Sequence, residues 1–162
     1  MDFSRQLKLS DPAIAETMAA AAPMPLDAGT RNAKLAAPIE NLTWDRSISD
    51  ADAARACVAG LWLLANDLDR AHRICQELET AEGRYWHGVV HRREGDYGNA
   101  RYWFRRAGAR PAFPGDWSPL SFVDRVEAFV LRGHGDEAEL IALQRREWVT
   151  LFDHCRRRAL GD

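Results

Sequence analysis

Three histidines are the residues of this chain best suited to coordination chemistry. His87 and His91 are four apart on one face of an expected helix, and His72 lies on the preceding one. Such imidazoles can bind Zn²⁺, which takes three or four ligands in a tetrahedral arrangement. Gly88 follows His87, so there is no HExxH motif, and there is no CxxC. We favour two partly buried histidines, hydrogen-bonded to neighbouring helices, and expect no metal or cofactor; His72, His87 and His91 are weak metal candidates.

Arginine and aromatic side chains gather in the same stretch. Residues 84–110 hold seven arginines against two acids, Glu94 and Asp96, which gives a local charge of +5. Guanidinium groups beside Trp86, Tyr102 or Trp103 can hold a carboxylate or phosphate. With twenty arginines and two lysines, however, arginine is the general cation of this chain. Pairing with acids elsewhere is therefore favoured, and anion binding is the alternative.

The helix expected at 97–108 has a packing face and an outer edge. Ala100, Phe104 and Ala107 share the packing face, which leaves Asn99, Trp103 and Arg106 along one edge. Tryptophan and arginine are common anchors of binding surfaces. The alternative is that Trp103 belongs to the core and Asn99 caps a loop. The candidate recognition surface comprises His87, His91, Arg92, Asn99, Trp103 and Arg106.

Helices must position these residues. Apolar residues recur at helical spacing over 50–65, 68–80, 84–94, 97–108, 119–132 and 136–158, and no segment alternates with period two. The sequence predicts an all-α fold, a stack of three antiparallel helical hairpins (50–80, 84–108, 119–158) within a domain over 47–162. Residues 1–46 are broken by four prolines and predict a leader that is irregular or has one short helix near 11–21.

The stretch 84–111 also resembles a known repeat. The matching residues are Gly88, Gly95, Asp96, Tyr97, Ala100, Phe104, Ala107 and Pro111. They resemble the tetratricopeptide repeat, a helix–turn–helix unit of about 34 residues, whereas 55–80 match it weakly. The resemblance implies a TPR-like protein-interaction scaffold. The strings at 85–94 and 99–106 are more narrowly similar to a group of bacterial proteins, a resemblance that implies no mechanism.

Composition narrows the classes of function. The net charge of −2 gives no overall attraction to nucleic acid, and no apolar run is long enough to span a bilayer. Three widely spaced cysteines suit a reducing compartment, so a cytoplasmic location is expected. His154 and Cys155 are adjacent, so their side chains diverge on a helix and do not form a nucleophilic pair. No nucleophile elbow, P-loop or dinucleotide fingerprint is present.

The leading hypothesis is a non-enzymatic interaction module that binds a protein or peptide partner through 84–108. The alternative is a small-molecule or anion-binding protein, with enzymatic activity left open, whose pocket is lined by histidine and arginine and oriented by Asp124. Asp124, Glu147 and Asp153 stand among large apolar residues and are candidates to pair with the basic hairpin. Assembly into a homo-oligomer stays open.

Overall fold

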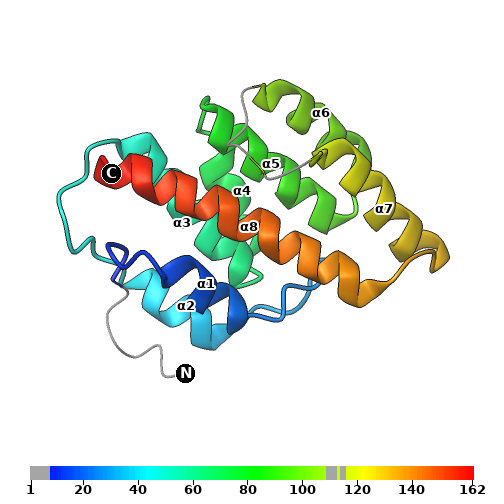
Figure 1. Ribbon diagram of the computed structural model, residues 1–162, viewed down its shortest axis with the longest axis horizontal. Helices are drawn as coiled ribbons and strands as arrows, with labels where there is room; N and C mark the ends of the chain where they lie inside the picture. Colours follow the sequence, from blue (N-terminus) through cyan, green and yellow to red (C-terminus); the bar gives the residue numbers. More distant parts are fainter. Residues whose placement is uncertain (1–7, 109–112, 114–115) are drawn as a thin grey trace.

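The computed structural model describes residues 8–108, 113 and 116–162, and these residues form helices and no strand (Figure 1). The all-α prediction is confirmed. The helices are α1 (Ile14–Ala20), α2 (Ala33–Glu40), α3 (Ala51–Leu64), α4 (Leu68–Cys75), α5 (Ala81–Glu94), α6 (Tyr97–Ala107), α7 (Pro119–Arg132) and α8 (Glu137–Leu160).

Capping residues set where most of the helices begin and end. A side-chain oxygen just before the helix accepts a hydrogen bond from a backbone amide of the first turn, which satisfies a donor that the helix itself leaves unpaired. Asp50, Asp67, Thr80, Asp96, Ser118 and Asp136 do this for α3 to α8. Gly95 ends α5 in the left-handed conformation, where a side chain would be strained.

Helices α3 to α6 form two packed pairs, and small residues allow one of them to close tightly. α3 packs against α4, α5 against α6, and α4 against α5. A Cβ atom at Gly88 on α5 would lie 2.8 Å from the ring of Phe104 on α6, so only glycine permits this approach. Ala100, Phe104 and Ala107 are buried, as the sequence predicts.

The last two helices separate in space. α7 packs mainly on α6, whereas α8 packs mainly on α3 and α1 and crosses the front of the stack in Figure 1. The indole of Trp148 on α8 donates a hydrogen bond of 2.8 Å to the Gly60 carbonyl on α3. The third helical pair is thus splayed, because α8 covers the core that α3 and α5 share. No helix in the described part of the chain is long and apolar enough to cross a membrane.

The described part of the leader, residues 8–46, contains two helices, where the sequence analysis expected at most one. α1 matches the expected helix near 11–21, but α2 was missed because Pro38 lies within it. Asn32 caps α2 through the amides of Lys34 and Leu35, and the helix continues past the proline because Leu35 and Ile39 are buried. Leader residues share the core of the helical body.

Candidate functional site

The three histidines of α4 and α5 meet in space. One candidate ligand nitrogen from each of His72, His87 and His91 lies within 4.8 Å of the others. His87 and His91 are 3% and 9% exposed, while His72 is half-buried. The ring of His72 is inclined by 62° to that of His87 and by 76° to that of His91, with centroids 4.7 Å and 5.0 Å away. The sequence spacing placed His87 and His91 on one face of a helix. The packing of α4 on α5 brings His72 beside them.

The two buried histidines do not behave as the sequence analysis expected. Hydrogen bonds to neighbouring helices were expected, but the Nδ1 atom of His87 has no hydrogen-bond partner among the described residues. The Nδ1 atom of His91 lies 3.1 Å from Glu94 Oε2 on its own helix, and Glu94 Oε1 lies 3.9 Å from His72 Nδ1. A buried ring nitrogen without a partner normally costs free energy, so the burial of His87 Nδ1 needs an explanation.

Burial sets the charge of the cluster. Removal from water, together with the neighbouring His72 and His91, lowers the pKa of His87 to about 4. Burial also lowers the pKa of His91, against the opposing charge of Glu94. Both imidazoles are therefore neutral at neutral pH, and each has a ring nitrogen with a free lone pair.

Aromatic rings continue from the histidines to the surface. His91 stacks on His87 with centroids 4.9 Å apart, and His87 stacks on Trp103 of α6 at 4.0 Å. Tyr102, 48% exposed, meets Trp103 edge-on, and the Arg106 guanidinium lies 5.5 Å from the Tyr102 ring centre. Trp103 is half-buried, so it combines the core and edge roles that the sequence left open.

Arg92 does not belong to a recognition surface, contrary to the sequence analysis. Its side chain is fully buried and forms an ion pair with Glu147 of α8, at 2.5 Å between Nη2 and Oε2. The Tyr85 hydroxyl donates to the same carboxylate, and Gln144 accepts from Arg92. This pairing confirms the predicted role of Glu147, whereas Asp153 pairs with Arg156 and Arg157 of its own helix.

Arg93 links the leader to the helical body, a role that the sequence does not indicate. Its guanidinium donates to the backbone carbonyls of Asp27, Ala28 and Leu63 and to the side-chain oxygen of Asn66. Burial, followed by the neighbouring Arg92, lowers its pKa to about 10. No sequence signal marks this role, because the acceptors are mostly backbone atoms far away in the chain.

The remaining predicted site residues lie apart from the histidines or serve local structure. Asn99 donates to Asp96, the residue that caps α6. Asp124 is 66% exposed at its side chain and pairs with Arg101 at 2.7 Å. It therefore pairs with the basic hairpin, as expected, but orients no buried pocket, because this pair lies at the exposed edge of the α6–α7 contact.

A basic and aromatic face covers the outer side of α6. We call Tyr102, Trp103, Arg105 and Arg106 the α6 face. Within the described residues, Arg105 and Arg106 have no carboxylate oxygen within 4 Å, unlike Arg101 of the same helix. Both arginines are exposed.

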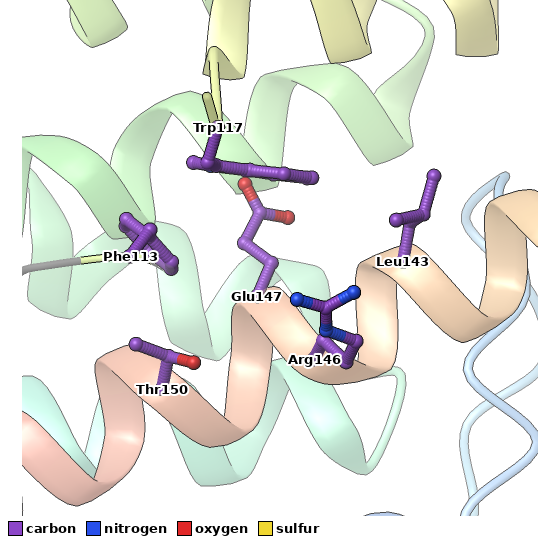
Figure 2. A pocket seen from close by; sticks show the side chains of 6 residues that line it. All are labelled: Phe113, Trp117, Leu143, Arg146, Glu147 and Thr150. Atoms are coloured by element: carbon purple, nitrogen blue, oxygen red, sulfur yellow. The ribbon is translucent and has the colours of Figure 1, made fainter. Parts of the chain in front are cut away.

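A separate pocket lies between α8 and the segment before α7 (Figure 2). Phe113, Trp117, Leu143, Arg146, Glu147 and Thr150 line it. Figure 2 shows the Glu147 carboxylate directed toward the ring of Trp117. That carboxylate is already paired with Arg92 and with the Tyr85 hydroxyl, so it is occupied within the fold. None of the other predicted site residues lines this pocket.

Comparisons of the chain with protein-family models, curated proteins and solved structures gave no match. Its function is therefore inferred from its own side chains.

Proposed function

We propose that this chain is a non-enzymatic helical interaction module whose α6 face binds an acidic segment of a partner protein. The observation that carries the proposal is that the exposed Arg105 and Arg106 have no carboxylate partner among the described residues, while Arg106 lies 5.5 Å from the centre of the exposed Tyr102 ring. Guanidinium groups form strong paired hydrogen bonds with carboxylates, and aromatic residues add apolar contact area.

The charge pattern of the chain supports this assignment. Most other described arginines bind groups of the same chain: ten pair with an acid, and Arg73, Arg93 and Arg145 donate to backbone carbonyls. A pocket for a small anion would need a buried arginine that is free to bind it. Both Nη groups of Arg92 already donate to Glu147 and Gln144, so the pocket alternative loses its strongest cation.

The test uses two labelled peptides of equal length, one built of Glu and Tyr and the other of Lys and Tyr. We expect fluorescence anisotropy to show binding of the Glu/Tyr peptide only, with an affinity that falls as salt rises. The double variant Arg105→Glu/Arg106→Glu should weaken this binding by roughly tenfold or more, since two attractive contacts become repulsive.

The matched control is Arg132→Glu/Arg146→Glu, which reverses two other exposed arginines outside the α6 face. This control should bind like the wild type. Equal losses in the two double variants would show only a general charge effect and would contradict the proposal. Absence of peptide binding, together with a thermal shift produced by free phosphate or citrate, would favour the small-anion alternative instead.

A further inference from the structure

We propose that His72, His87 and His91 form a binding site for a divalent transition-metal ion of the Zn²⁺ class, with Glu94 orienting the two imidazoles beside it. This inference goes beyond the proposed function, because the site lies between α4 and α5 and uses none of the arginines of the α6 face. It also reverses the preference drawn from the sequence, which favoured histidines without a metal.

The first support is the convergence of the three rings. Their candidate ligand nitrogens lie within 4.8 Å of one another. In a tetrahedral zinc site, Zn–N bonds of about 2.0–2.1 Å place neighbouring nitrogens roughly 3.4 Å apart. His87 and His91 lie one turn apart on the same helix, so their side chains share one face. Their rings are stacked at 14°, so coordination of one ion requires these side chains to rotate.

The second support is independent of the spacing. The Nδ1 atom of His87 is buried and has no hydrogen-bond partner within the described residues. Buried ring nitrogens are ordinarily satisfied by protein atoms or ordered water. Because His87 is also covered by Trp103 at 4.0 Å, its ring faces the other two histidines on one side and an indole on the other.

The surroundings of the cluster match those of known metal sites. A ligating histidine commonly hydrogen-bonds through its second nitrogen to a carboxylate, which fixes the ring and raises its basicity. Glu94 lies 3.1 Å from Nδ1 of His91 and 3.9 Å from Nδ1 of His72, so a small adjustment lets it hold either ring. Asp96 Oδ2 lies 3.9 Å from His91 Nδ1 and adds negative charge that favours a cation.

The donor set indicates the class of ion. Neutral imidazoles suit Zn²⁺, Co²⁺, Ni²⁺ and Cu²⁺, whereas Mg²⁺ and Ca²⁺ require mostly oxygen ligands. His72 is half-buried, so the cluster is reached by solvent at this residue and a water molecule or an added ligand can complete the coordination.

The test uses the full chain, purified without a histidine tag and stripped of metal with a chelator. Titration with Co²⁺ should give one bound ion per chain and the intense visible absorption of four-coordinate Co²⁺. One equivalent of Zn²⁺ should abolish this absorption by displacing the Co²⁺.

Two variants and a control separate a built site from adventitious binding. His72→Ala should lose the visible absorption, while circular dichroism of the metal-free protein stays unchanged because His72 is half-buried. Glu94→Gln should keep the absorption and bind Co²⁺ about 10–100-fold more weakly, as loss of an outer carboxylate does in other sites. His134→Ala removes an exposed histidine outside the cluster and should match the wild type.

Several outcomes would overturn the proposal. These are the absence of stoichiometric Co²⁺ or Zn²⁺ binding by the wild type, unchanged binding by His72→Ala, or loss of binding by His134→Ala. An affinity unchanged in Glu94→Gln would overturn the role of Glu94. The variant Arg105→Glu/Arg106→Glu should lose peptide binding and bind metal as the wild type does. A failure of the peptide proposal can therefore be told apart from a failure of the metal proposal.

Discussion

Arg92 of α5 and Glu147 of α8 form a doubly hydrogen-bonded ion pair in the interior, with 2.5 Å between Nη2 and Oε2 and 3.1 Å between Nη1 and Oε1. The Tyr85 hydroxyl also donates to this carboxylate, and the Arg92 guanidinium lies 4.5 Å from the ring centre of Phe122 on α7. The pair therefore joins three helices. The negative charge of Glu147 explains why Arg92, which the sequence had assigned to the surface, can be buried.

Removing one partner of this pair should be strongly destabilising. Glu147→Ala leaves a buried guanidinium without a counter-charge, which costs about 3–5 kcal/mol of unfolding free energy. Asp124→Ala breaks an exposed arginine pair and should cost under about 1 kcal/mol. Urea denaturation of both variants measures the difference. Similar losses in the two proteins would contradict the assignment of the Arg92–Glu147 pair to the interior.

Two glycines on neighbouring helices should respond in opposite directions to a methyl group. Gly88→Ala drives a Cβ to 2.8 Å from the Phe104 ring and should destabilise the fold by about 1–3 kcal/mol. Gly98→Ala on α6 meets nothing closer than 3.9 Å and should stabilise it by about 0.5–1 kcal/mol, because alanine loses less backbone entropy in a helix. Thermal unfolding compares them, and a rise in Tm for Gly88→Ala would refute the close contact.

Arg93 should control the stability of the segment around residues 27–28. Arg93→Lys cannot span the Asp27, Ala28, Leu63 and Asn66 oxygens that the guanidinium reaches. In this variant we expect the amide hydrogens near residues 27–32 to exchange with solvent faster than in the wild type. Hydrogen exchange followed by mass spectrometry measures this rate. Arg73→Lys, an exposed arginine on α4, is the control and should leave this exchange unchanged. Equal exchange in both variants would argue against Arg93 as the anchor.

The three thiols should be unreactive while the protein is folded. Cys57, Cys75 and Cys155 are buried, and burial raises the pKa of each thiol above its usual value, so the nucleophilic thiolate is scarce. Ellman's reagent should label the native protein only at the rate of unfolding, and label all three thiols quickly in denaturant. Rapid modification of a single cysteine in the native protein would place that residue at the surface.

Asp50 should contribute to acid sensitivity. Its hydrogen bond from the Ala53 amide and the nearby Arg158 lower its pKa below the usual value, against the effect of burial. This stabilisation is therefore present above the unfolded-state pKa, near 3.9, and is lost as the pH falls through the lower folded-state value. Asp50→Asn keeps a capping side chain and removes the charge. Its stability should be lower than that of the wild type at pH 7 and equal to it in strong acid; a constant difference would contradict this.

Local signals explain which parts of the fold could be predicted. Asp96 before α6 and Gly95 after α5 mark a turn by their own chemistry, and Ala100, Phe104 and Ala107 mark a buried face by spacing. α2 escaped prediction because Pro38 breaks the local pattern while burial of Leu35 and Ile39 sustains the helix.

The site was harder to predict because its geometry depends on distant contacts. The helical spacing of His87 and His91 could be read directly, and His72 was a candidate by residue type, but only the packing of α4 on α5 shows that the three lie together. Within the run of arginines, composition could not separate inward from outward side chains. Arg92 turns inward because it pairs with Glu147, and Arg93 turns inward because it donates to the carbonyls of Asp27 and Ala28. All three acceptors are more than fifty residues away in the chain.

The contacts between α8 and the leader bear on how the molecule comes apart. Arg145 donates hydrogen bonds to the carbonyls of Ala19 and Ala22, and Gln144 donates to those of Met24 and Pro25. A linear stack of repeats can fray one unit at a time, since each unit touches only its neighbours. Here α8 contacts both the leader and α3, so the helices do not form a linear series in which each contacts only its neighbours. Such a molecule should lose its structure in one cooperative step.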